Sequence, residues 1–300
     1  MEMKLGIVGL DSSHVSAFTH LLNDPQDPFH LEGARVAWAY PGVPSMDFDF
    51  SYNRLDGYTR ELRDEFGVEM LDSEEAVAEM ADAIFLEQVD SRKRVEQFSK
   101  IVTFGKPIFV DKAFALNTAD AAQMIGLAQR YKTPLMSCSA LRYCQGMNVA
   151  MADDSSGSIL GADFFGPMPI QPTQNQFFWY GVHTADMLLR AMGRGCESVR
   201  VTHTEHHDQM TALWKDGRIG TIRGVRGGAN CFGGVIHREK GSQYLNSEND
   251  EIPYYASLLA VILSMFQTGT QPDSNEELME VMRFLEAANQ SLKDGRAVRL

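Results

Sequence analysis

The first half of the chain alternates between short hydrophobic runs and longer segments in which apolar residues recur with helical spacing. A continuous apolar run is typical of a strand buried on both faces, and helices between such strands favour a parallel arrangement. The pattern therefore predicts a Rossmann-like, doubly wound parallel sheet. Its expected strands cover residues 4–10, 34–40, 68–71, 82–88, 106–112 and 134–140.

The helices between these strands carry recognisable end signals. Asn117 precedes a helical pattern as an N-cap residue does, and Asp72 and Glu75 have the spacing of a cap pair. Gly67 and Gly105 follow helical patterns at the point where a left-handed residue is favoured. The end signals thus agree with the periodicity. The expected helices cover residues 12–23, 56–66, 72–80, 91–105 and 117–131.

The pattern changes after residue 140. A helix is expected at 142–152, and a Gly/Pro-rich stretch at 157–172 leads to another helix at 181–193. Successive strand patterns without intervening helices then predict an open, mainly antiparallel sheet. These expected strands cover 198–206, 210–225 (folded at Asp216 and Gly217), 232–239 and 242–247.

The chain ends in two expected helices, at 254–269 and 275–295, and Ser274 with Glu277 has the spacing of a capping box. We therefore expect two domains. Residues 1–140 form a dinucleotide-binding α/β domain, and residues 141–300 form an α+β domain for substrate binding and oligomerisation.

Composition narrows the range of partners. The formal net charge is −13 and no basic cluster offsets it, which disfavours nucleic acid and anionic membranes. The apolar run at 254–266 is shorter than the roughly 20 residues of a membrane span. The 4 cysteines include no C-x-x-C pair, so neither a disulfide framework nor a zinc knuckle is indicated. With no secretion signal visible, we expect a cytoplasmic protein.

The segment after the first strand, "GLDSSH" at 9–14, has the outline of a dinucleotide-binding turn. Gly9 can supply the tight bend, but Asp11 and His14 occupy the places of the second and third glycines. A carboxylate at Asp11 would repel a pyrophosphate, whereas as a helix N-cap it could accept from the amides of Ser13 or His14. Ser12 or Ser13 could donate to a phosphate. These residues alone leave cofactor binding open.

The second strand ends at Tyr40 without the acidic residue that would bind the adenosine ribose, although Tyr40 could stack on the adenine. Single histidines and carboxylates on different strands are common in proteins, so we expect no metal site, although His14 could join His183, Glu87 or Asp111. The run "HTEHH" at 203–207 is expected at the surface.

Two segments, 105–143 and 181–193, closely resemble motifs of the Gfo/Idh/MocA oxidoreductases, the family of glucose-fructose oxidoreductase and inositol dehydrogenase. The resemblance spans nearly the whole chain. It implies NAD or NADP as cofactor and hydride transfer between nicotinamide and a carbinol or carbonyl carbon of a sugar, polyol or related small molecule. It also implies a homodimer or homotetramer formed through the C-terminal sheet.

In that family the fifth strand ends in Glu-Lys-Pro, and here the triplet is Asp111-Lys112-Ala113. The resemblance makes Lys112 the first catalytic candidate, because an ammonium can polarise a hydroxyl or carbonyl and share a proton with it. A salt bridge between Lys112 and Asp111 is the alternative. The family's Gly-x-His-x-x-Asp motif corresponds to Gly181, His183 and Asp186.

This reading makes His183 a candidate for proton transfer, with Asp186 orienting its ring or bonding the backbone. Where many family members have an aspartate one turn earlier, this chain has Trp179, beside Tyr180. Tyr180 could act as an acid or base, Trp179 could stack on a sugar ring, and Arg142 is a further substrate-binding candidate.

The family's Thr-Pro-Asn segment after the fourth strand is replaced by Glu87, Gln88 and the residues up to Asp90, which could meet ribose hydroxyls. Two other functions stay open. One is a catalytically silent relative that binds a sugar-like ligand or a partner without a dinucleotide. The other is a lyase or glycoside-cleaving enzyme that uses the same cofactor for a transient oxidation.

Overall fold

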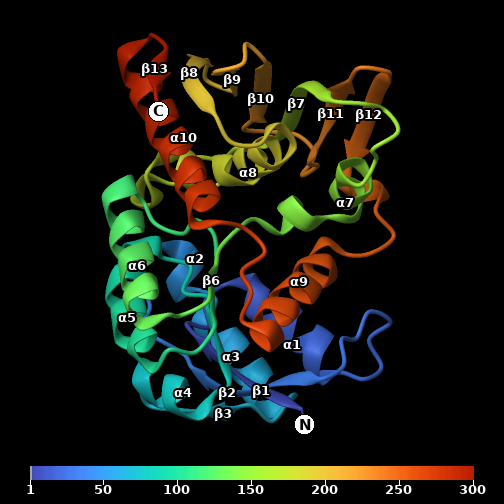
Figure 1. The fold of residues 1–300 in the computed structure, drawn as a ribbon. Helices are drawn as coiled ribbons and strands as arrows, with labels where there is room; N and C mark the ends of the chain where they lie inside the picture. Colours follow the sequence, from blue (N-terminus) through green and yellow to red (C-terminus); the bar gives the residue numbers. More distant parts are fainter. Residues whose placement is uncertain (1) are drawn as a thin grey trace. The chain divides into compact units, whose positions relative to one another are not determined.

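The computed structural model describes residues 2–300, which fold into two compact units (Figure 1). The first comprises the chain up to Ala115 together with Ala119–Cys138 and Tyr255–Asp273. The second comprises Leu116–Thr118, Ser139–Tyr254 and Ser274–Leu300. None of the described helices is long and apolar enough to cross a membrane.

The first unit contains a parallel six-stranded sheet in the order β3-β2-β1-β4-β5-β6. The order reverses direction between β1 and β4, which is the arrangement of a doubly wound dinucleotide-binding sheet. All six strands predicted from the hydrophobic pattern are present. Their bounds are β1 Met3–Val8, β2 Ala34–Tyr40, β3 Glu69–Met70, β4 Ala83–Leu86, β5 Ile108–Val110 and β6 Leu135–Met136.

Helices cover both faces of this sheet, with α4, α5 and α6 on one face and α1 and α9 on the other (Figure 1). Gly67 and Gly105 end their helices with the predicted positive φ. The predicted cap pair at Asp72 is wrong, because Ser73 is the N-cap and accepts from the Ala76 amide at 3.1 Å. The helices are α1 Ser13–Asn23, α2 Asp49–Tyr52, α3 Leu55–Asp64, α4 Glu74–Met80, α5 Arg94–Ile101, α6 Thr118–Tyr131 and α9 Tyr254–Thr268.

An aromatic core joins α1 and α9 to the sheet. Phe18 of α1 lies with its ring centroid 5.4 Å from that of Phe85 in β4, and Phe266 of α9 lies 5.2 Å from Phe85 on the same measure. The late helix α9 therefore belongs to the first unit. This differs from the expected division at residue 140, which placed all of 141–300 in the second domain.

The second unit is built on a seven-stranded sheet in the order β12-β11-β7-β10-β9-β8-β13. It is mainly antiparallel, as predicted, but β7 and β10 pair in parallel. Two strands were missed, β13 and β7, the latter lying inside the Gly/Pro-rich stretch. The strands are β7 Ile159–Pro167, β8 Cys196–His203, β9 His207–Trp214, β10 Ile219–Val225, β11 Gly233–Arg238, β12 Gly241–Asn246 and β13 Val298–Arg299.

The glycines of β7 have a packing role rather than a turn role. A Cβ at Gly166 would lie 2.3 Å from the Phe232 ring, and one at Gly161 would lie 2.9 Å from the Ile219 carbonyl oxygen. Close approach of neighbouring groups therefore requires glycine inside this strand. The glycines were interpreted as signs of a loop, and β7 was therefore not predicted.

Helices α7 Gln145–Met151, α8 Gly181–Met192 and α10 Asn275–Asp294 complete the second unit. The capping box at the start of α10 is confirmed. The Ser274 hydroxyl oxygen accepts from the Glu277 amide at 3.2 Å, and the Glu277 carboxylate accepts from the Ser274 amide at 2.8 Å.

Candidate active site

The turn after β1 depends on Gly9, whose φ is +86°. A Cβ at this position would lie 2.6 Å from both the Cα and the backbone nitrogen of Gln88. Glycine is therefore required here for its left-handed conformation and for the close approach of the segment after β4. The amides of Gly9 and Leu10 donate to the carbonyls of Tyr40 and Pro41, each at 2.9 Å.

Asp11 is fully buried and its carboxylate is bound by the protein itself. Oδ1 accepts from the Val89 amide at 2.7 Å, and Oδ2 accepts from the Ser51 hydroxyl at 2.6 Å and from the Gln88 side-chain amide. Burial raises the pKa of Asp11, and these hydrogen bonds oppose the rise. The carboxylate that we expected beside a pyrophosphate is thus held by donors from α2 and from the loop after β4.

Asp11 is not the cap of α1, which was one of the two roles that the sequence left open. Ser12 is the N-cap, and its hydroxyl oxygen accepts from the His14 amide at 3.2 Å. The donors Ser51 and Val89 are 40 and 78 residues away from Asp11 along the chain, so local sequence gave no sign of them. Ser13, the first residue of α1, is exposed.

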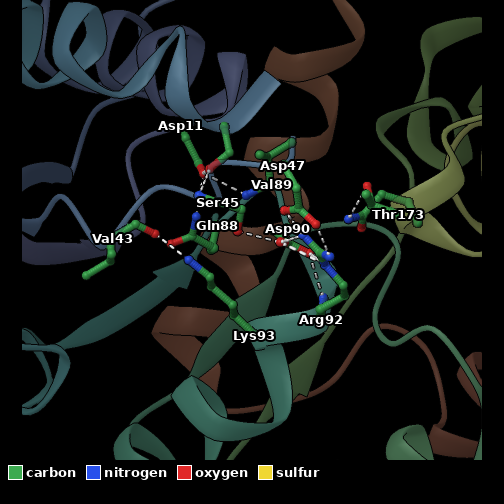
Figure 2. A network of polar contacts seen from close by, with 12 residues as sticks. Asp11, Val43, Ser45, Asp47, Gln88, Val89, Asp90, Arg92, Lys93 and Thr173 are labelled. Atoms are coloured by element: carbon green, nitrogen blue, oxygen red, sulfur yellow. Dashed lines mark hydrogen bonds and ion pairs between the residues drawn. The ribbon is translucent and has the colours of Figure 1, made fainter. Parts of the chain in front are cut away.

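The loops after β2 and β4 are tied together by polar contacts (Figure 2). The Ser45 hydroxyl donates to Asp90 at 2.5 Å, and the Arg92 guanidinium binds Asp47 at 2.6 Å and Asp90 at 2.7 Å. The Lys93 ammonium donates to the Val43 carbonyl at 2.5 Å. The segment that follows Tyr40 is therefore fastened to the segment that follows Gln88.

Three ionisable side chains meet at the carboxyl ends of β1, β4 and β5. His14 Nδ1 lies 2.9 Å from Asp111 Oδ1 and 3.6 Å from Glu87 Oε2. The two carboxylates raise the pKa of His14 to about 9, against the effect of its burial. Burial and the charge of Asp111 raise the pKa of Glu87 to about 7, whereas the His14 imidazolium lowers the pKa of Asp111.

Lys112 follows Asp111 at the end of β5. Asp111 Oδ1 accepts from the Lys112 backbone amide at 2.7 Å, and the Lys112–Ala113 peptide bond is cis. Burial lowers the pKa of the Lys112 ammonium, although the charge of Asp111 opposes this. A lysine with a lowered pKa is better suited to sharing a proton with a substrate hydroxyl.

Glu87, Gln88 and Asp111, expected as cofactor contacts, are all buried and face other residues of the first unit. Arg94, which the sequence reading did not single out, is also fully buried. Its guanidinium donates to the carbonyl oxygens of Ala113 at 2.6 Å, Gln88 at 2.9 Å and Asp111. Arg94 therefore fixes the backbone on both sides of Lys112.

In the second unit, His183 lies in the first turn of α8 and contacts Ser139. The Ser139 hydroxyl lies 2.7 Å from His183 Nδ1, and the Ser139 amide donates to Asp186 Oδ2 at 2.6 Å. Asp186 thus bonds the backbone, and Ser139 makes the contact with the ring. Sequence reasoning missed Ser139, although it lies within the segment at 105–143 that carries the family resemblance.

Arg142 and the aromatic candidates contact Asp186 and His183. The Arg142 guanidinium is buried and donates to Asp186 Oδ1 at 2.9 Å. The rings of Tyr180 and Phe232 each lie 5.3 Å from the His183 ring, centroid to centroid, and Trp179 lies 5.7 Å from Tyr180. His183 is therefore held by the Ser139 hydroxyl and by the neighbouring rings of Tyr180 and Phe232. Lys112 belongs to the first unit and His183 to the second.

Comparison with known proteins shows which fold the chain shares. No family model and no curated protein matches the chain. Among solved structures, myo-inositol 2-dehydrogenase from Lactobacillus plantarum has a TM-score of 0.81 at 15% identity, covering 100% of both chains. A probable dehydrogenase from Thermotoga maritima has 0.80 at 16%, covering 99% of this chain and 98% of its own.

GenD2 from gentamicin A biosynthesis, solved in complex with NAD, has a TM-score of 0.79 at 14% identity, covering 100% of this chain and 96% of its own. The chain has the Gfo/Idh/MocA fold. At these identities the likeness is one of fold, and the fold class predicted from the sequence is confirmed.

The residues of the turn after β1 indicate whether this Gfo/Idh/MocA fold can bind a dinucleotide there. The Asp11 carboxylate is bound by internal donors, so its charge is partly compensated. Ser12 and Ser13 stand at the N-terminus of α1, a helix of 11 residues whose positive end favours an anion. The charge at this helix start is thus compatible with a pyrophosphate, and Tyr40 is the last residue of β2, the strand end near which dinucleotide-binding folds bind adenosine.

Proposed function

We propose that this protein is an NAD(P)-dependent oxidoreductase that transfers a hydride between nicotinamide and a carbinol or carbonyl carbon of a sugar, polyol or related small molecule. The observation that carries the proposal is Lys112, a half-buried lysine at the end of β5 in a fold shared with known dehydrogenases. Two solved structures of that fold support the substrate class. Myo-inositol dehydrogenase from Lactobacillus casei was solved with NAD(H) and myo-inositol, and an oxidoreductase from Agrobacterium radiobacter with NAD+ and L-tartaric acid.

In the proposed reaction the bound nicotinamide supplies the hydride acceptor or donor. The start of α1 at Ser12 and Ser13 would hold the pyrophosphate, and Tyr40 would contact the adenosine. Lys112 Nζ polarises the reacting oxygen of the substrate and shares its proton. His183, with Nδ1 beside the Ser139 hydroxyl, moves the proton between substrate and solvent. Tyr180, Trp179 and Arg142 line the substrate side.

Fluorescence titration with NADH and NADPH tests cofactor binding directly. We expect saturable binding of at least one of them at micromolar concentration. Ser13→Glu should weaken it at least 10-fold, because a carboxylate at the start of α1 competes with the pyrophosphate while still favouring the helix. Gln123→Glu, an exposed site within α6, adds the same charge elsewhere and should leave binding unchanged. Absence of binding up to millimolar cofactor would end the proposal and favour a ligand-binding relative without catalysis.

Activity on a panel of polyols and sugar acids tests the catalytic assignment. Lys112→Met should keep cofactor binding and lower kcat about 10²- to 10⁴-fold, the usual contribution of one acid-base group. Product analysis separates simple oxidation from a lyase or glycoside-cleaving cycle. An unchanged kcat in Lys112→Met would remove this lysine from the mechanism.

We also propose a homodimer or homotetramer formed through the sheet of the second unit. Leu213 of β9 and Ile219 of β10 are directly paired, and they are 40% and 53% exposed. Light scattering tests the assembly, and Leu213→Asp should dissociate it if this face is buried between subunits. A cytoplasmic location is proposed too, because Cys138, Cys144, Cys196 and Cys231 form no disulfide with one another within residues 2–300. Cell fractionation tests that location.

A further inference from the structure

The His14, Glu87 and Asp111 side chains form a cluster with the composition of a metal site. One nitrogen and two carboxylate oxygens, supplied by three separate chain segments, all lie within 4.8 Å of one another. Within residues 2–300 no other group of three or more histidine, cysteine or acidic side chains comes together in this way. Ligand atoms about 2.0–2.2 Å from one metal lie roughly 3–3.5 Å apart. The distances from His14 Nδ1, 2.9 Å and 3.6 Å, are close to that spacing.

An independent observation concerns the Glu87 carboxylate. Glu87 is 0% exposed, and neither of its oxygens has a hydrogen-bond partner among the described residues. A buried carboxylate without donors is strongly unfavourable unless it binds a proton or a cation. Its Oε2 faces the imidazole nitrogen that Asp111 also faces. The oxygens of Glu87 are therefore turned into the cluster with no protein donor to satisfy them.

The Arg94 guanidinium makes no hydrogen bond to Glu87, although its charge lowers the pKa of that carboxyl. The Arg94 guanidinium lies 4.0 Å from Asp111 Oδ2, and its donors bind the carbonyl oxygens of Gln88, Ala113 and Asp111. Arg94 thus supports the backbone around the cluster. Two carboxylates and a neutral imidazole would together balance the charge of one divalent ion.

We propose that His14 Nδ1, Glu87 and Asp111 bind a divalent transition-metal ion, with zinc as the best-suited probe. Imidazole with carboxylates suits Zn²⁺ and its transition-metal neighbours, whereas Mg²⁺ prefers oxygen ligands alone. The ion takes the place of the proton that His14 otherwise shares with Asp111. This inference does not depend on the proposed oxidoreductase function, because it concerns side chains beneath the turn and needs no dinucleotide.

Metal analysis of the protein comprising residues 1–300 tests the site. After EDTA treatment and desalting, calorimetric titration with ZnCl₂ at pH 8 should give one site per chain with micromolar or tighter affinity, and MgCl₂ should bind at least 100-fold more weakly. Bound Zn²⁺ should raise the thermal unfolding midpoint. Glu87→Gln keeps the shape of the side chain but removes a ligand, so it should weaken Zn²⁺ at least 100-fold.

The matched control removes a histidine–aspartate pair elsewhere. His203 Nδ1 lies 2.7 Å from Asp208 Oδ1 on the second sheet, and His203→Gln should leave zinc binding unchanged. X-ray absorption of the zinc-loaded wild-type protein gives a readout that needs no variant, and we expect one imidazole with oxygen ligands. The proposal is overturned by sulfur in the zinc shell, by wild-type affinity in Glu87→Gln, or by no stoichiometric zinc binding below about 100 μM.

Discussion

The carboxylates of Glu87 and Asp186 are both buried, but the two units treat them differently. Each oxygen of Asp186 has a donor, the Ser139 amide at 2.6 Å for one and the Arg142 guanidinium at 2.9 Å for the other. Neither oxygen of Glu87 has a hydrogen-bond partner in the described chain. A fully bonded carboxylate fixes the geometry around it, whereas one without donors retains capacity for a ligand or a proton.

The largest effect is expected from removing the charge of Asp186. Asp186→Asn leaves the buried Arg142 guanidinium without its closest counter-ion, and Glu277 at 3.5 Å compensates only in part. We expect the free energy of unfolding to fall by about 3–5 kcal/mol, measured by urea denaturation. Asp216→Asn, which breaks an exposed pair with Arg218, should cost less than about 0.5 kcal/mol. Equal losses in the two variants would contradict the comparison.

A slightly smaller effect is expected at Gly9, next to the segment that carries Glu87. Gly9→Ala combines a left-handed backbone with a clash against the backbone of Gln88, so we expect a loss of about 2–4 kcal/mol in the free energy of unfolding. Gly126 lies in α6 with open space around it. Gly126→Ala should instead stabilise the protein by about 0.5–1 kcal/mol. An unchanged free energy of unfolding in Gly9→Ala would mean that the backbone around Gln88 shifts at little cost.

Ser139→Ala sharpens the comparison on the Asp186 side. The variant loses the contact with His183 Nδ1 and the cap on the Leu141 amide but keeps the backbone bond to Asp186. We expect a loss of about 1–2 kcal/mol in the free energy of unfolding, together with a lower kcat in the dehydrogenase assay. Ser155→Ala, at an exposed site, is the control. An unchanged kcat would assign Ser139 a purely structural role.

The smallest effect is expected for Glu87→Gln in protein freed of metal with EDTA. Near pH 5 its free energy of unfolding should lie within about 1 kcal/mol of the wild-type value. The pKa of Glu87 is raised from an ordinary 4.5 to about 7 in the folded protein. A raised carboxyl pKa means that wild-type stability is lost as pH rises through that interval. Glutamine does not titrate, so Glu87→Gln should gain stability relative to the wild type between pH 5 and 8. If the free energy of unfolding changed with pH in the same way in Glu87→Gln and in the wild type, the prediction would be contradicted.

The hydrophobic pattern was sufficient to predict the first sheet, because buried parallel strands are continuous apolar runs such as those of β1 and β4. It missed β7, where glycine serves close packing at Gly161 and Gly166. The family resemblance pointed to Lys112 and His183. Contacts between distant segments could not be predicted locally, so nothing in the sequence indicated that Ser51 and Val89 are the donors to Asp11.

The His14 cluster could be predicted only in part. Glu87 and Asp111 follow β4 and β5, and His14 begins the helix after β1. Because β1, β4 and β5 are neighbours in a parallel sheet, their carboxyl ends meet at one edge. Strand order, once known, brings these three residues together. His14, Glu87 and Asp111 are recognisable in the sequence as candidates, but the distances between them depend on the fold.

The return of α9 to the first unit has a practical consequence for engineering. A fragment ending near residue 140 would lack Tyr255 and Phe266, whose rings lie beside Phe18 and Phe85. Such a truncation would expose an aromatic surface to water and should aggregate on expression. Grafting either unit onto another protein therefore needs two splice points, so that residues 255–273 travel with the N-terminal part.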